Sequence, residues 1–180
     1  PTTRDTISKV MQQPTITALA PVDEFMCMGE TYLWLLDRPN RVAQAWQRLG
    51  IEAVEIKADK DGRFSWHDDQ GSELTWYTVA KCGDGRIWYA EGKVRPGPLL
   101  PSVPVKAVAV LRHGIRKNDH GVPIIRHQCE VYLQTDSKAA ALVTRILGPA
   151  APRMAEQGAE QLLMFFSGIA RYVERHPSKA

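Results

Sequence analysis

Residues 153–176, RMAEQGAEQLLMFFSGIARYVERH, are the most informative stretch of this 180-residue chain. On a helical wheel with about 100° per residue, the apolar side chains of this stretch fall on one half. They are Met154, Gly158, Leu162, Leu163, Phe165, Phe166, Ile169, Ala170, Tyr172 and Val173, and Met164 is the one large apolar side chain on the polar half. A stripe this wide must be buried against a broad surface. The stretch therefore predicts a long C-terminal helix that covers another layer of the fold.

The chain that precedes this helix supplies a sheet as the second layer. Apolar runs with period-two alternation are separated by turn sequences, and the Asp-Gly pairs at 61–62 and 84–85 favour tight hairpin turns. Antiparallel sheets tolerate one solvated face, so a single helix can cover the other face. We therefore predict an α+β fold, in which a curved antiparallel sheet of about seven strands grips a long C-terminal helix. The expected strands are 25–36, 51–57, 63–67, 73–81, 86–94, 105–113 and 124–135.

Two shorter helices are also expected along the chain, one before the hairpins and one before the terminal helix. Asp37 is a candidate N-cap, and Pro39 opens a helix that Gly50 ends. A second short helix is predicted over 138–147, where Gly148-Pro149 would end or kink it.

The predicted domain organisation is simple. Residues 1–20 are expected to be a lead-in segment with one short amphipathic helical turn. Residues 21–177 are expected to form a single domain, and residues 114–123 a long exposed hairpin loop within it.

Composition narrows the class of protein. The hydrophobic content of 44% and the charged content of 24% are ordinary for a globular domain. The net charge is +3 and the Lys and Arg residues are scattered along the chain, so no nucleic-acid partner is expected. The cysteines Cys27, Cys82 and Cys129 are odd in number and far apart, which favours a reducing compartment. No stretch is apolar and long enough to span a bilayer, and the N-terminus lacks an apolar signal core. We therefore expect a cytoplasmic protein.

In this order of elements the chain resembles the START-like, or helix-grip (SRPBCC), superfamily, which includes Bet v 1-like and polyketide cyclase-like proteins. The resemblance covers most of residues 25–177 and rests on topology. It is carried by the early strand, the short helix in LLDRPNRVAQAWQRLG, the hairpins and the terminal helix. The segment DGRFSWHDDQGSELTWYTV is similar to the early meander of the family.

The resemblance implies a single helix-grip domain with an apolar cavity between the sheet and the long helix. Members of the superfamily mostly bind lipids, sterols, polyketides or other hydrophobic molecules, some catalyse cyclisation or hydrolysis, and some bind proteins. This chain departs from the simple pattern in its leader of about 20 residues and in the expected break at 148–152. Both features bear on the mouth of the cavity.

Aromatic and histidine residues are the candidates for ligand contact. Trp66, Trp76 and Trp88 lie on successive expected strands, and a concave sheet would bring them toward the terminal helix. His113 and His127 lie on inward faces of strands that can pair, so either could offer a polar contact. Core packing is the competing interpretation for every one of these residues. The predicted ligand-binding residues are Trp66, Trp76, Trp88, His113, His127, Leu162, Phe165 and Ile169.

The expected function is the binding or transport of a small hydrophobic or amphipathic molecule. No sequence motif for a metal, nucleotide or catalytic nucleophile occurs, so no cofactor and no metal are expected. One alternative is a cyclase- or hydrolase-like enzyme on the same scaffold, with His127 or Glu91 as its acid–base residue. Another alternative is a protein-binding module with a filled core. Leu99 and Leu100, in a proline-rich loop, could make a transient membrane or protein contact.

Overall fold

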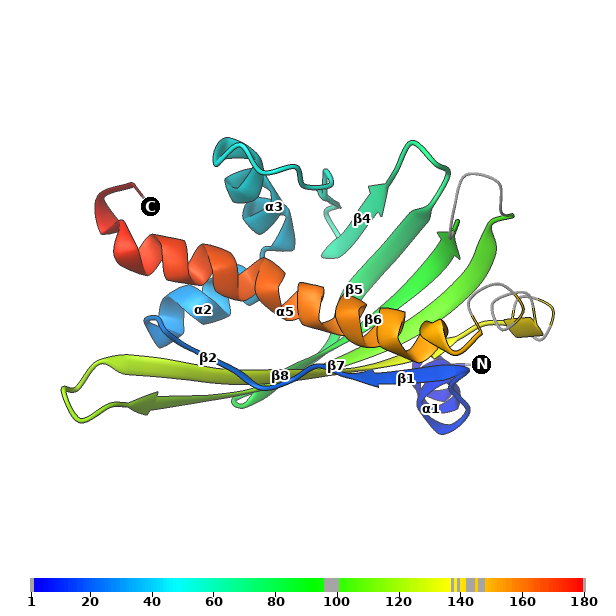
Figure 1. Cartoon of the computed structure of the whole chain (residues 1–180), viewed down its shortest axis with the longest axis horizontal. Coiled ribbons are helices and arrows are strands. Elements are labelled where there is room, and N and C mark those ends of the chain that lie inside the picture. The colour runs from blue at the N-terminus through cyan, green and yellow to red at the C-terminus, as the bar shows by residue number, and fades with distance from the viewer. Residues whose placement is uncertain are drawn as a thin grey trace.

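One long helix lies across the concave face of a single sheet in this protein (Figure 1). The computed structural model describes residues 2–95, 101–136, 138, 140–141, 145 and 148–179. The described strands are all antiparallel and follow the order β1-β8-β7-β6-β5-β4-β3, with β2 also paired to β8. The predicted α+β helix-grip fold is therefore confirmed. The elements are α1 (Thr3–Gln12), β1 (Ile16–Leu19), β2 (Asp23–Met26), α2 (Gly29–Leu36), α3 (Pro39–Arg48), β3 (Lys57–Ala58), β4 (Arg63–His67), β5 (Glu73–Cys82), β6 (Gly85–Val94), β7 (Val103–Lys117), β8 (Pro123–Gln134), α5 (Ala150–Arg175) and a 3₁₀ turn (Pro177–Lys179).

Helix α5 confirms the prediction made from residues 153–176. It begins slightly earlier, at Ala150, with Pro149 as its N-cap residue and Gly148 before it at a positive φ of 48°. Its buried stripe includes Leu163, Phe166 and Ile169, which join one apolar cluster with β7, β8 and α2. Burial of this stripe, rather than helix propensity alone, explains why the helix is long and where it lies.

The central hairpins also match the prediction, with longer strands than expected. Strands β4, β5 and β6 follow the expected segments closely, whereas β7 and β8 extend into residues 114–123. The expected long loop is therefore a short turn. The side-chain oxygen of Asn118 accepts hydrogen bonds from the backbone N–H groups of His120 and Val122, at 3.0 and 2.9 Å, which closes the turn within a few residues.

The strand predicted over 25–36 is wrong for most of its length. Strand β2 ends at Met26, and Gly29–Leu36 form helix α2. Tyr32, Leu35 and Leu36 are buried together because they share one face at helical spacing, while Trp34 points to solvent. A short apolar run is compatible with both periods, and here contact with α5 selects the helix.

The strand predicted over 51–57 is also wrong. Only Lys57 and Ala58 pair with β4, and residues 51–56 run without strand hydrogen bonding. Ile56 is buried and Val54 is half exposed, and both side chains line the space between sheet and helix. The apolar alternation of this segment thus reflects contact with that space rather than membership of the sheet.

Helix α1 covers part of the opposite, convex face of the sheet (Figure 1). Val10 is fully buried there against Tyr89 and Val108. Its N-terminus is closed by a capping box between Thr2 and Asp5. Within the expected lead-in segment, α1 therefore packs on the sheet and β1 is one of its strands.

Some predictions fall outside the described part of the chain. Leu99 and Leu100 lie there, as does most of the helix predicted over 138–147. Within the described residues, no helix combines the length and the apolar character needed to cross a membrane.

Candidate ligand cavity

A cavity of about 480 Å³ lies between the concave face of the sheet and the N-terminal half of α5. Its sheet wall comes from β4 to β8, and its other walls come from α5, from Val54 and Ile56, and from Pro39 of α3. Val54 and Met154 line it while remaining 46% and 50% exposed, so the cavity opens to solvent beside them. A volume of this size suits one small organic molecule.

The space exists because small residues face small residues. Ala90, Ala107 and Ala109 form a patch on the inner face of β6 and β7, where Ala90 pairs directly with Ala107. Gly158 and its small neighbours Ala155 and Ala159 present a matching stripe on α5. A Cβ atom added at Gly158 would meet no atom within 4 Å. Larger side chains at these positions would fill the interior, as in an ordinary close-packed core.

Aromatic rings wall this space. Trp66, Trp76 and Trp88 come from the sheet, and Phe165 and Phe166 come from α5. The rings of Trp88 and Phe166 stack with centroids 5.9 Å apart and an interplanar angle of 9°. Trp88 is almost fully buried, so this stack closes the inner end of the cavity.

The cavity has no ionisable lining among the described residues. Each of those lining residues is aliphatic or aromatic, or is methionine, glycine or proline, and the indole N–H groups are the only side-chain hydrogen-bond donors they carry. Contact with such walls makes the binding of apolar surface favourable, and an unpaired polar group on the occupant would make binding less favourable. The arrangement can hold an apolar molecule, and it offers no acid–base pair to one.

The structure brings five of the predicted site residues to the cavity, namely Trp66, Trp76, Trp88, Leu162 and Phe165. Ile169, His113 and His127 do not line it. Ile169 is 2% exposed and packs in the core, farther along α5. The two histidines are paired in register on β7 and β8, beyond the closed end of the cavity.

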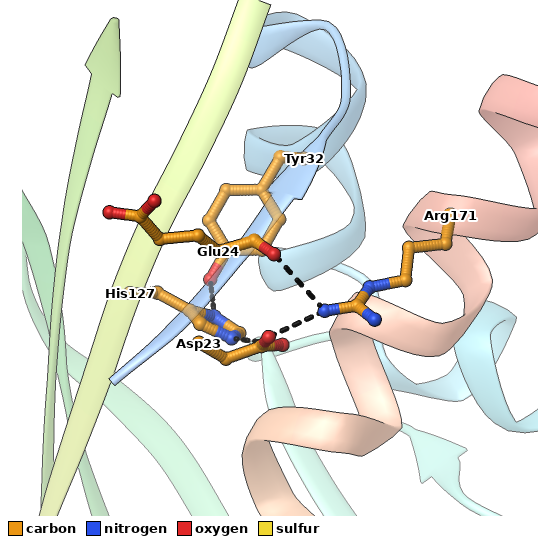
Figure 2. A network of polar contacts seen from close by, with 5 residues as sticks. All are labelled: Asp23, Glu24, Tyr32, His127 and Arg171. Atoms are coloured by element: carbon orange, nitrogen blue, oxygen red, sulfur yellow. Dashed lines mark hydrogen bonds and ion pairs between the residues drawn. The ribbon is translucent and has the colours of Figure 1, made fainter. Parts of the chain in front are cut away.

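His127 belongs instead to a polar network in which His127 and Tyr32 are buried and Asp23 and Arg171 are partly exposed (Figure 2). Its Nε2 lies 3.4 Å from a carboxylate oxygen of Asp23, and its Nδ1 lies 2.6 Å from the hydroxyl of Tyr32. A carboxylate can only accept, so Nε2 carries the hydrogen and Tyr32 donates to Nδ1. Arg171 on α5 also binds Asp23, and it donates to the backbone oxygen of Glu24 at 3.3 Å.

Burial controls the protonation of this network. Desolvation lowers the pKa of His127 to about 4, and the nearby Asp23 carboxylate opposes that shift only in part. Burial likewise raises the pKa of Tyr32. His127 is therefore neutral at physiological pH, and the network is a set of hydrogen bonds around a single ion pair.

His113 is a different case. It is buried, and neither of its ring nitrogens has a hydrogen-bond partner in the described part of the chain. Desolvation, and then the positive charge of Arg86, lower its pKa, so it too is neutral. No group of three His, Cys, Asp or Glu side chains that could hold a metal ion occurs among the described residues.

Sequence reasoning missed the residues that create the cavity. Ala90, Ala107 and Ala109 give a detectable signal, since they occupy alternate inward positions that large residues usually fill. The network of Asp23, Tyr32 and Arg171 gives no such signal, because its members come from separate elements.

Comparison with known proteins shows the fold and no family. No family model matches the chain, and no curated protein matches it. The solved structure of a conserved protein from Geobacillus kaustophilus is similar over 89% of this chain and 97% of that chain, with 14% sequence identity and a TM-score of 0.55. This similarity supports the helix-grip fold. An identity this low says nothing about a shared ligand.

Two other solved structures resemble the chain more weakly. The di-domain ARO/CYC BexL from the BE-7585A biosynthetic pathway is similar over 91% of this chain and 52% of that chain, with 15% identity and a TM-score of 0.46. Norcoclaurine synthase from Thalictrum flavum is similar over 83% of this chain and 87% of that chain, with 11% identity and a TM-score of 0.38. With TM-scores below 0.5, neither assigns a ligand or a reaction to this chain.

Proposed function

We propose that this protein binds a small, largely apolar molecule in the cavity between the sheet and the N-terminal half of α5. The observation that carries the proposal is the cavity itself, about 480 Å³ in volume and lined by apolar residues throughout its described walls. Burial of apolar ligand surface contributes about 25 cal/mol per Å² before the costs of association. The aromatic walls favour an occupant with flat or extended hydrocarbon surface.

The two alternative functions receive less support. Neither residue considered for acid–base catalysis lies in the cavity: His127 is in the polar network, and Glu91 accepts a hydrogen bond from Tyr89 on the convex face. A protein-binding module with a filled core fits poorly with a cavity larger than the roughly 300 Å³ at which ligand sites begin. The cytoplasmic location stays an expectation, supported by the free thiols of Cys27, Cys82 and Cys129.

A cavity-filling variant tests the proposal. Phenylalanine at Ala107 would occupy the centre of the cavity floor, where Ala107 faces α5. Lys106→Phe is the matched control, because Lys106 is the next residue on β7, exposed on the opposite face. The probe is N-phenyl-1-naphthylamine, a neutral apolar dye whose fluorescence rises on leaving water.

We expect the wild type and Lys106→Phe to bind the dye with similar affinity, and Ala107→Phe to lose at least about tenfold, since its own ring replaces the dye. Native mass spectrometry of the protein from its own host should show a bound mass that Ala107→Phe lacks. Equal dye affinity in Ala107→Phe and wild type would overturn the proposal.

A further inference from the structure

Helices α2 and α3 lie beside the C-terminal half of α5 (Figure 1), and a second concave site is lined by residues of all three helices. We call it the three-helix trough, and its volume is about 690 Å³. It shares no described lining residue with the apolar cavity. Its lining is Glu30, Thr31, Trp34 and Leu35 from α2, Arg41, Gln44, Ala45 and Arg48 from α3 with Leu49 directly after it, and Ile169, Tyr172 and Val173 from α5.

Each helix gives one stripe of side chains to the trough, at the spacing that one helix face requires. The buried side chains of Leu35 and Ile169, with the half-buried Ala45 and Val173, supply apolar surface at its base. The base of the trough is therefore apolar.

Trp34 stands on the wall of the trough and is 46% exposed. The guanidinium of Arg38 lies 4.8 Å from its ring centroid, which holds the indole by a cation–π contact. Large exposed aromatic side chains next to arginine are typical of binding surfaces, where they anchor a partner. Trp34 therefore offers exposed aromatic surface to an occupant of the trough.

The rim of the trough has an excess of positive charge. No carboxylate in the described chain forms an ion pair with Arg38, Arg41 or Arg48, and Glu30 is the one carboxylate in the lining. The guanidinium of Arg41 donates a hydrogen bond to the side-chain oxygen of Gln44, at 3.1 Å. Arg38 and Arg41 also lie at the start of α3, where the helix dipole disfavours cations. The positive charges of Arg38, Arg41 and Arg48 are therefore not neutralised by an ion pair within the described chain.

We propose that the three-helix trough binds a single-chain anionic amphiphile of the long-chain carboxylate class. The hydrocarbon chain would lie along the floor of Leu35, Ile169 and Val173, against the face of Trp34. The carboxylate would bind a guanidinium of the rim, Arg41 or Arg48, by charge-assisted hydrogen bonds. A guanidinium rim selects an anion over a cation or a neutral head group.

The tryptophans allow this site and the cavity to be observed separately. The chain has five tryptophans, and each gives one indole N–H signal in a ¹H–¹⁵N spectrum. Trp34→Phe assigns the signal of the trough, while Trp66, Trp76 and Trp88 report on the cavity. The probe is dodecanoate, used below its critical micelle concentration. We expect dodecanoate to shift the Trp34 signal, and to do so equally in Ala107→Phe, whose cavity is filled.

Charge variants test the chemistry of the trough. Arg41→Gln combined with Arg48→Gln should weaken dodecanoate binding at Trp34 by about tenfold or more, because each charge-assisted contact is strong. Both side chains are exposed, so the fold should be retained, and binding of N-phenyl-1-naphthylamine in the cavity should not change. Lys106→Gln with Arg112→Gln is the matched control, since it removes two exposed charges from the convex face.

Dodecyltrimethylammonium has the same chain with a cationic head, and it should leave the Trp34 signal in place. Three results would overturn the inference: an unmoved Trp34 signal with dodecanoate, equal binding of the cation, or equal weakening by the control pair. Loss of dye binding in Ala107→Phe bears only on the cavity, so the failure of one site is distinguishable from failure of the other.

Discussion

Acidification should destabilise this protein through His127, well before most carboxylates are protonated. The ring is buried and neutral, and it contacts Tyr32 and Asp23 on its two sides. Protonation would place a charge in the core beside Arg171 and His113, and both of these neighbours further disfavour it. The unfolded chain has no such restriction, so it takes up the proton first.

The size of this effect follows from the two pKa values. The pKa of His127 is about 4 in the folded protein, against 6.5 for the unperturbed group. Because the folded pKa is depressed, the stability that His127 contributes is complete above pH 6.5 and is lost as the pH falls toward 4. From pH 7.5 to pH 5 the loss is about 2 kcal/mol, and it approaches about 3 kcal/mol below pH 4.

Urea unfolding at a series of pH values measures this loss, and His127→Gln isolates it. The variant should show a pH profile flatter by about 2 kcal/mol between pH 7.5 and pH 5, whatever its own stability. The ring signals of His127 in the wild type give a second reading, since about nine tenths of the folded molecules should carry a neutral ring at pH 5. A ring that titrates near pH 6.5, or a variant with an unchanged profile, would refute the reasoning.

Three further variants test contacts outside the cavity. Tyr32→Phe removes the donor to the buried Nδ1 of His127 and should cost about 2 kcal/mol in urea unfolding, and a cost near zero would mean that this nitrogen finds another partner. Gly168→Ala should lower stability by about 1 kcal/mol and change the near-UV circular dichroism, because the added Cβ would overlap the ring of Trp46, whereas a gain would show that the ring moves freely. Val10→Ala should cost about 2 kcal/mol by weakening the contact of α1 with the sheet, while dye affinity stays constant, and a loss of affinity would contradict the separation of the two faces.

The sequence predicts the fold well where one period dominates over a long stretch. The stripe of residues 153–176 is long enough to exclude a strand, and the Asp-Gly pairs at 61–62 and 84–85 mark the β3–β4 and β5–β6 turns. The secondary structure of short apolar runs is harder to predict. Residues 29–36 fit both periods, and only the packing of α2 against α5 decides between them. The run at 51–56 alternates like a strand because it lines a cavity from one side.

The candidate site could be predicted only in part, for a physical reason. Large aromatics such as Trp66, Trp76 and Trp88 attract notice in a sequence, but a cavity depends on the residues that fail to fill it. Whether Ala107 leaves a space depends on what lies opposite, and that is settled by where α5 crosses the sheet. The same holds for His127, whose inward direction follows from strand alternation, while its distance from the cavity depends on the tertiary arrangement.

The two ends of α5 differ in their polar contacts to the rest of the fold, and this difference explains how one interior contains both a packed core and a cavity. Toward its C-terminus the helix is fixed by polar contacts, from the indole of Trp46 to the backbone oxygen of Phe165 at 2.9 Å and from Arg171 to Asp23. Arg171 reaches α2 and β8 through Asp23, His127 and Tyr32, so one network joins four elements (Figure 2).

Residues 150–164 have no side-chain hydrogen bond or ion pair to another element in the described chain. A helix anchored at one end can lie across a space at the other end without full packing beneath it, and that space is the cavity.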